Sequence, residues 1–267
     1  MATAGKKLQT HLVAPTLITT LLSAFPEEEV SVQALLRAGV LFGVTERGIR
    51  VALGRLSAEK KIQNTSRGNY MSARRTGTVH RAIVDWRPAE IRIVPWDRSW
   101  LCMLGAAVSR GERTQLNRHE QALRFRGFRE LLPSFWVRPA NLRAGLGVRD
   151  ELCQLGLHPH AHLMVASEFE KGLDTKARKL WKPEHLEKKY ASNVKMLETS
   201  MQNLNKLTAE DGLVETLTCG RAVIRDIVLD PLLPQELVDV ELRRSMIEHM
   251  KTYDDIGHKL WRSFLFS

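Results

Sequence analysis

The stretch TERGIRVALGRLSAEKKI, Thr45 to Ile62, decides how the N-terminal part of this chain folds. Thr45 can cap a helix, and apolar residues follow it at i, i+3, i+4 and i+7 spacing. This apolar stripe consists of Ile49, Ala52, Leu53 and Leu56. At about 100° per residue, the opposite side carries Arg47, Arg50, Val51, Gly54 and Ala58, with Arg55 on its flank. The sequence therefore predicts an amphipathic helix whose basic outer face has the shape to enter a DNA major groove.

Two helices are expected before this segment and a hairpin after it. Residues 15–25 and 31–38 have apolar residues at helical spacing, and two glycines interrupt the chain before Thr45. Residues 64–72 read as a short hairpin with Arg67-Gly68-Asn69 at its tip, since Gly and Asn accept positive φ. Three helices in this order followed by a hairpin predict a winged helix-turn-helix.

The predicted DNA contacts divide into two kinds. We expect Arg47 and Arg50 to select bases, whereas the basic residues around the hairpin contact phosphates and set the affinity. Gly54 would let the helix approach the DNA backbone closely. The full set of predicted DNA-binding residues is Thr45, Arg47, Arg50, Val51, Gly54, Arg55, Lys60, Lys61, Arg67, Asn69, Arg74 and Arg75.

The distribution of charge along the chain favours DNA binding over two simpler interpretations of this helix face. An exposed basic helix face is often only solvated surface, and units of three helices and a hairpin also serve as protein-interaction modules. Residues 1–81 contain 12 Lys and Arg against 5 Asp and Glu, a net charge of +7, whereas the other 186 residues contribute +3 to the total of +10. The excess is local to the predicted reading helix, which favours a nucleic-acid partner.

Composition restricts the class of protein. The chain of 267 residues is 43% hydrophobic, which supports two or three domains with real cores. Cys102, Cys153 and Cys219 show no metal-ligand spacing, and their odd number favours a reducing, cytoplasmic setting. The segment after Lys6-Lys7 resembles a signal peptide superficially, but its apolar residues form a stripe, so a helix is expected there. We expect no membrane span, because no run of about 18 apolar residues occurs.

Beyond Pro88 short apolar runs alternate with helical patterns. Strands are expected over 91–94, 99–108, 130–139 and 160–169, and helices over 114–126 and 147–155. Such alternation predicts a ferredoxin-like α/β sandwich within an overall α+β fold.

The C-terminal third is expected to be helical. Apolar residues recur at spacings of three and four after Pro183 and again over 242–260, which is typical of core or dimer contacts. Asp226 and Asp230 are expected to pair with Arg221 or Arg225 and hold the turn between these helices. The alternative is that Arg221 and Arg225 hold an anionic ligand.

Three stretches carry a resemblance to a known family: WDRSW over 96–100, RHEQALRFRGFRELLPSFWVRP over 118–139, and residues 221–261, which contain the phrase RDIVLDPLLP. Together they resemble the PaaX family of bacterial transcriptional regulators, of which this chain looks like a divergent member. The resemblance implies a dimeric, DNA-binding repressor of aromatic-acid catabolism that is released from DNA by a small anionic metabolite such as an aryl-acyl-coenzyme A.

The leading prediction is therefore a cytoplasmic transcriptional repressor that binds double-stranded DNA as a homodimer. The expected domains are a winged helix-turn-helix over 1–85, a ferredoxin-like domain over 90–175 and a helical domain over 176–267. We expect no enzymatic activity and no cofactor or metal, since the sequence lacks a phosphate-binding glycine loop, a nucleophile elbow and a carboxylate pair.

The rival prediction is a metal-dependent nucleic-acid hydrolase that uses the ferredoxin-like domain. Such nucleases need an acidic residue at the end of the first strand, where this chain has AAVSR over 106–110. His158, His160 and His162 alternate along an expected strand, which would spread them over about 13 Å, too far to share one zinc ion. A Mg²⁺-dependent cleavage assay separates the rival from the repressor.

Overall fold

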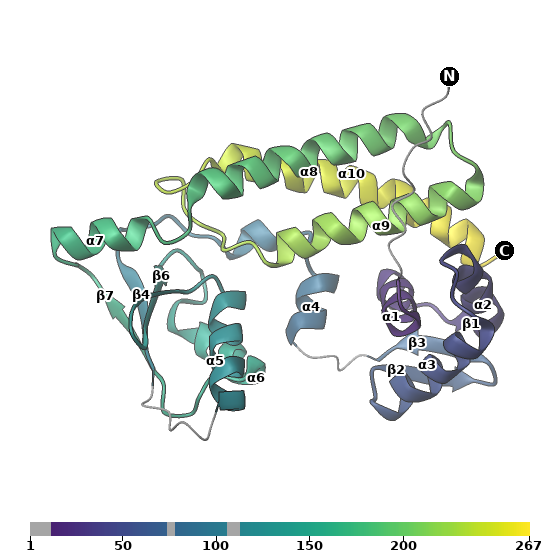
Figure 1. Cartoon of the computed structure of the whole chain (residues 1–267), viewed down its shortest axis with the longest axis horizontal. Helices are drawn as coiled ribbons and strands as arrows, with labels where there is room; N and C mark the ends of the chain where they lie inside the picture. Colours follow the sequence, from purple (N-terminus) through teal and green to yellow (C-terminus); the bar gives the residue numbers. More distant parts are fainter. Residues whose placement is uncertain (1–11, 74–77, 106–112) are drawn as a thin grey trace. The chain divides into compact units, whose positions relative to one another are not determined.

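The computed structural model describes residues 12–73, 78–105 and 113–267 (Figure 1). It is a mixed α+β structure with about 59% helix, two small antiparallel sheets and a helical C-terminal region. Contacts divide the chain into two compact units: unit 1 comprises residues 1–76, 199–221 and 252–267, and unit 2 comprises residues 77–198 and 222–251. Within the described ranges, no helix combines the length and apolar character needed to cross a membrane.

Unit 1 begins with three helices and a three-stranded sheet. These elements are α1 (Ala14–Ala24), β1 (Val30–Ser31), α2 (Val32–Leu41), α3 (Glu46–Ala58), β2 (Ile62–Ser66) and β3 (Asn69–Ser72). Strand β3 lies between β1 and β2 and pairs antiparallel with both. Helix α3 ends before the basic stretch that follows it, since Lys60 has a φ of +55° and turns the chain toward β2.

The core of unit 1 combines residues from both ends of the chain. Leu17, Ile18, Leu21 and Leu22 of α1 are fully buried, and the inner residues of α2 and α3 pack with them. Leu213 and Leu217 of α9 and Trp261 and Leu265 of α10 belong to the same cluster. The first three helices pack mainly on one another, and residues far along the sequence complete this core.

Unit 2 contains the second sheet. Its elements are α4 (Thr78–Val84), β4 (Trp100–Leu104), α5 (Arg113–Phe125), β5 (Arg129–Leu132), β6 (Phe135–Pro139), α6 (Val148–Leu155), β7 (His162–Ala166) and α7 (Lys171–Arg178). The strand order is β5-β6-β4-β7, and every neighbouring pair is antiparallel. Inward side chains of β4 and β6 pack with α5 and α6 in one apolar cluster.

Two sequence expectations for this region were wrong. Residues 91–94 do not form a strand: the 3-10 helix η1 (Ala89–Arg92) occupies the first two of them, and only Ile93 makes an isolated bridge, to Leu142. Residues 130–139 form the hairpin β5–β6 and not one strand, because Ser134 adopts a φ of +59° and reverses the chain.

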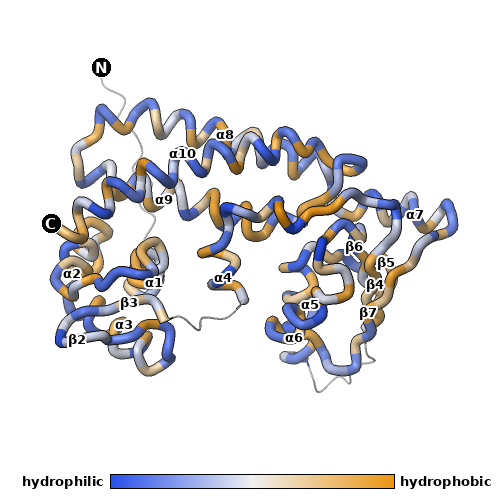
Figure 2. Tube along the Cα trace, turned by 180° about the vertical axis from the view of Figure 1, so that it is seen from behind, coloured by the Kyte–Doolittle hydropathy of each residue, from blue (hydrophilic) through white to orange (hydrophobic). Residues whose placement is uncertain are grey.

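Three long helices complete the chain: α8 (Pro183–Leu204), α9 (Ala209–Val228) and α10 (Val240–Leu265). Hydrophobic residues recur between hydrophilic ones along all three (Figure 2), as the sequence pattern predicts. Each helix contributes residues to both units. The three contiguous domains expected from the sequence therefore differ from the two units, both of which are assembled from separate segments.

Gly127 tests how closely the chain packs after α5. Its φ is +78°, and a Cβ there would lie 3.0 Å from the Cα and carbonyl oxygen of Pro231. We expect Gly127→Ala to lower the free energy of unfolding by about 2–4 kcal/mol, from the left-handed conformation and overpacking together. Urea denaturation measures this loss.

Gly145 provides the matched control, since its φ is +49° but a Cβ would meet nothing within 4 Å among the described residues. Gly145→Ala should cost only about 1 kcal/mol, the conformational part alone. Equal losses for the two variants would contradict the close approach of Gly127 to Pro231.

Candidate nucleic-acid interface

Helix α3 is anchored by its inner face and its N-cap. Ile49, Leu53 and Leu56 are at most 3% exposed, as the apolar spacing predicts. The Gly48 amide donates a hydrogen bond to the Thr45 hydroxyl at 3.1 Å, which confirms the predicted N-cap. A cap of this kind stabilises a helix by about 1 kcal/mol. The outer face is therefore held by a well-packed scaffold.

The outer face of α3 is exposed throughout its length. All of the predicted groove-facing residues on it are solvent-accessible: Arg47, Arg50, Val51, Gly54, Arg55 and Ala58. Val51 is 64% exposed, so an apolar side chain stands among the arginines. A shallow depression continues this surface toward Pro15 of α1. Cations and one apolar side chain thus share the outer face of α3.

Two carboxylates accompany the cations on this surface. Glu46 lies 2.7 Å from Arg50, and Glu59 lies 2.7 Å from Arg55 and 2.8 Å from Lys61. Hydrogen bonds from Lys61 and Arg55 lower the pKa of Glu59 to about 2. Such exposed pairs contribute little to stability, so their cations can exchange partners at small cost.

Three other basic residues have no ion-pair partner among the residues that the structure describes. They are Arg47 on α3, Lys60 in the turn after it, and Arg67 at the tip of the hairpin. All three are exposed. The sequence pattern gives Arg47 and Arg50 the same role, whereas the structure separates the unpaired Arg47, Lys60 and Arg67 from the paired Arg50, Arg55 and Lys61.

The hairpin tip has the predicted turn geometry. Gly68 has a φ of +84°, and its carbonyl accepts a hydrogen bond from the Val32 amide at 2.7 Å. The Asn69 side chain donates to Ser66 at 3.0 Å and to Glu29 at 3.2 Å. Asn69 therefore directs its amide donors to Ser66 in the turn and to Glu29, which precedes β1.

Four further basic residues lie where the structure gives no information. Arg74 and Arg75, which are predicted phosphate contacts, lie outside the described residues, as do Lys6 and Lys7. Residues 106–110, on which the comparison with nucleases depends, also lie outside them.

The expected pairing around the 225–234 phrase was wrong. Arg221 and Arg225 are exposed on α9. Asp226 instead lies 2.7 Å from Lys189 and accepts a hydrogen bond from Asn193, whereas Asp230 accepts one from the Tyr190 hydroxyl at 2.5 Å. Residues on α8 thus take the role that the sequence assigned to the two arginines. Nothing in this arrangement distinguishes Arg221 or Arg225 as a ligand-binding residue.

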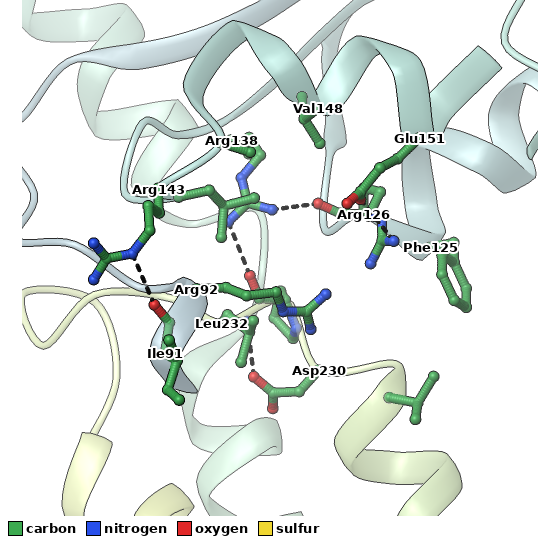
Figure 3. A pocket seen from close by; sticks show the side chains of 14 residues that line it. Ile91, Arg92, Phe125, Arg126, Arg138, Arg143, Val148, Glu151, Asp230 and Leu232 are labelled. Atoms are coloured by element: carbon green, nitrogen blue, oxygen red, sulfur yellow. Dashed lines mark hydrogen bonds and ion pairs between the residues drawn. The ribbon is translucent and has the colours of Figure 1, made fainter. Parts of the chain in front are cut away.

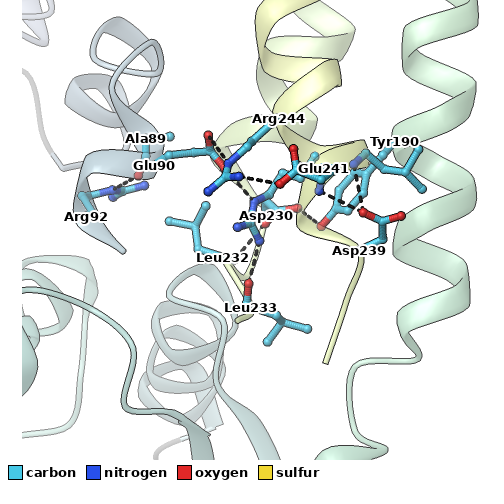
Figure 4. Close-up of polar contacts among 12 residues, drawn as sticks. Ala89, Glu90, Arg92, Tyr190, Asp230, Leu232, Leu233, Asp239, Glu241 and Arg244 are labelled. Carbon is cyan, nitrogen blue, oxygen red and sulfur yellow. Dashed lines mark hydrogen bonds and ion pairs between the residues drawn. The ribbon is translucent and has the colours of Figure 1, made fainter. Parts of the chain in front are cut away.

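Arg243 is the residue that the sequence missed in this region. Its side chain is 2% exposed, donates to the Leu233 carbonyl at 2.7 Å and lies 3.3 Å from Glu90. Figure 4 shows the two partners, the Leu233 carbonyl and the Glu90 carboxylate. A signal was present, since Arg243 lies three and seven residues before the buried Met246 and Met250. A cation on the apolar stripe of a helix indicates a buried, hydrogen-bonded position.

The three histidines do not share a strand. Only His162 lies on β7, whereas His158 and His160 belong to the preceding turn. His158 is buried; its amide donates to the His119 ring at 3.2 Å, and its own ring accepts from the His160 amide at 3.2 Å. The rings of His119 and His158 therefore accept hydrogen bonds from backbone amides. Among the described residues no three His, Cys, Asp or Glu side chains are grouped as metal ligands.

The pKa of Glu59 is open to direct measurement. We expect a carboxyl NMR titration to show Glu59 protonating near pH 2. In Lys61→Ala the pKa should rise toward the ordinary value of about 4.3, because the first of its two hydrogen-bonded cations is lost. Lys60→Ala serves as the control and should leave the titration unchanged.

The sign of any effect on stability follows from the direction of the shift. A lowered pKa in the folded state means that the contribution of Glu59 is present above about pH 4.3 and is lost as the pH falls toward 2. A normal Glu59 pKa in the unmodified protein would contradict the two short contacts.

Comparison with known proteins supports the fold alone. No protein-family model matches the chain, and no curated protein matches its sequence. Among solved structures it is similar to the uncharacterized protein Rv0674 from Mycobacterium tuberculosis, with a TM-score of 0.59 and 19% sequence identity. The alignment covers 93% of this chain and 99% of that one. The two proteins therefore share an arrangement of elements along almost their whole lengths.

Proposed function

We propose that this protein is a sequence-specific DNA-binding transcriptional regulator, in which α1 to α3 with β1 to β3 form a winged helix-turn-helix. Helix α3 enters the major groove, and the β2–β3 hairpin is the wing that contacts the adjacent minor groove or phosphates. The observation that supports this most directly is the exposed outer face of α3, where arginines stand beside an exposed valine on a well-anchored helix.

Gly54 supports the same proposal. A glycine inside a helix costs roughly 0.5–1 kcal/mol relative to alanine. A Cβ at Gly54 would meet nothing within 4 Å among the described residues, so packing within the chain gives no reason for glycine there. Close approach of a DNA backbone to the exposed face would give such a reason.

The finer description of the other elements belongs to this proposal. The β-α-β-β-α-β order of β4 to β7, with strand order β5-β6-β4-β7, fits a ferredoxin-like sandwich. We propose membership of the PaaX family on the motifs of residues 96–100, 118–139 and 221–261. From that follow a homodimer, repression as the mode of regulation, a cytoplasmic location and release from DNA by an anionic metabolite such as an aryl-acyl-coenzyme A.

Site selection from random DNA, followed by binding assays with variants, tests the proposal. A dimer should enrich two related half-sites one helical turn, about 34 Å, or a multiple of it apart. Arg50→Ala should relax preference at one base position at a cost of about 1–3 kcal/mol, whereas Lys61→Ala should weaken binding to all sequences alike. Failure to enrich any sequence would refute sequence-specific binding, and identical loss patterns would refute the division of roles.

Removing a carboxylate from the interface should strengthen DNA binding. Glu59 lies beside Arg55 and Lys61, so Glu59→Gln frees two cations and removes a charge that repels phosphates. We expect roughly threefold to tenfold tighter binding at low salt and a smaller gain as salt increases.

Glu120→Gln is the control for this experiment, because this substitution changes the net charge by the same amount as Glu59→Gln. Glu120 pairs with Arg124 on α5 of unit 2. Equal gains for the two variants would mean that only total charge matters. Such a result would count against α3 as the site of contact.

A further inference from the structure

Unit 2 contains a cavity of about 330 Å³ beside the segment that follows α9 (Figure 3). Its apolar walls include Phe125, Leu142 and Val228. Its charged lining residues are Arg92, Arg126, Arg138, Arg143, Glu151 and Asp230. Four guanidinium groups against two carboxylates leave an excess of positive charge around a partly open space with apolar walls.

Arg138 contributes a buried cation that is bonded only to neutral acceptors. Its side chain is 2% exposed and donates to the carbonyls of Arg126, Pro139 and Pro231 and to the Asn141 amide oxygen. Burial, together with the nearby charges of Arg92 and Arg126, lowers the pKa of Arg138 to about 9. The guanidinium remains charged at neutral pH, so the field that it creates in the cavity is positive.

Arg126 has an unused donor at the cavity. Its side chain is 8% exposed and one terminal nitrogen lies 2.6 Å from Glu151. Its Nε is fully buried and has no hydrogen-bond partner among the described residues. A buried donor without a partner is unfavourable, so the guanidinium group of Arg126 lacks a full set of hydrogen bonds.

We propose that this cavity binds a small organic oxyanion, a carboxylate or a phosphate monoester with an apolar body, whose oxygens accept hydrogen bonds from Arg126 and Arg92. The planar guanidinium group presents donors in a fork that matches both kinds of oxyanion. The apolar walls receive the body of the ligand and give it an advantage over inorganic anions. At roughly 30 Å³ per water molecule, the cavity has room for about ten waters, which fits a compact ligand.

Binding of an oxyanion in this cavity does not depend on DNA binding. Only a role of the ligand as an effector of DNA binding rests on the proposed function. Calorimetry with the free protein tests ligand binding, and a DNA-binding assay without ligand tests the proposed function. Failure of one proposal therefore leaves the other standing.

Isothermal titration calorimetry on the full chain tests the ligand class with four probes. Benzoate and phenyl phosphate represent the two oxyanions, benzyl alcohol lacks the charge, and inorganic phosphate lacks the apolar body. We expect saturable binding of benzoate or phenyl phosphate, at least about tenfold tighter than benzyl alcohol and inorganic phosphate. Absence of binding by both oxyanions up to millimolar concentration, or equal binding of the alcohol, would overturn the proposal.

Variants locate the site. Arg92 is partly exposed and has no ion-pair partner among the described residues, so Arg92→Gln should leave the fold intact and weaken binding about tenfold. Ala144→Trp should fill the cavity from its exposed edge and abolish binding. Arg118→Gln, on the exposed face of α5, is the control and should bind normally.

Thermal unfolding separates binding from damage. Arg92→Gln and Ala144→Trp should melt within a few degrees of the unmodified protein, so that lost binding reports on the cavity. Should both variants fold and still bind benzoate or phenyl phosphate normally, the ligand occupies another place and the proposed site is wrong.

Discussion

Burial of arginine side chains among backbone carbonyls is the constraint on which unit 2 depends. A buried guanidinium must satisfy up to five donors, and each unsatisfied one is costly. Arg138 and Arg243 meet this need with the carbonyls of Pro231 and Leu233, in a segment without regular secondary structure. Ladder hydrogen bonds do not fix such a segment. Its path after α9 is instead held by side chains. Two are the cations from β6 and α10; the others are Asn141, which donates to the Leu232 carbonyl, and Asp230, which accepts from the Leu232 amide.

The same constraint explains why charge and apolar surface occur together in this unit. A cation taken out of water keeps its field when it is bonded only to neutral groups, because no carboxylate cancels it. Apolar side chains around it limit how far water screens the field. The segment that the arginines hold forms one wall of a cavity whose lining combines positive charge with apolar surface.

Local patterns in the sequence predicted the elements that depend on local interactions. The stripe of Ile49, Leu53 and Leu56 predicts the buried face of α3, and Thr45 predicts its start, because both signals lie within a few residues of the atoms that they position. The hairpin within 130–139 was missed, although Pro133-Ser134 is a recognisable turn signal between two apolar runs.

Long-range polar contacts were beyond the reach of sequence patterns. Nothing near Arg138 or Arg243 indicates which carbonyl each one will find, since the partners lie far along the chain or in irregular segments. The ion pairs on α3 could be predicted more readily from the sequence, because Glu46 and Arg50 are four residues apart. Without these ion pairs, the paired Arg50 and the unpaired Arg47 look equivalent in the sequence.

The shared core of unit 1 has a consequence for biosynthesis. The side chain of Arg37 hydrogen-bonds the carbonyl of Phe264, a separation of 227 residues, and Trp261 and Leu265 complete the cluster that α1 begins. At roughly 5–20 residues per second, the ribosome needs about ten to forty-five seconds to supply the second half of that contact. During this interval the apolar faces of the first three helices have only part of their cover. Completion of the core of unit 1 is therefore a late event, and a nascent chain would leave part of this apolar surface open to chaperones until α9 and α10 have been synthesised.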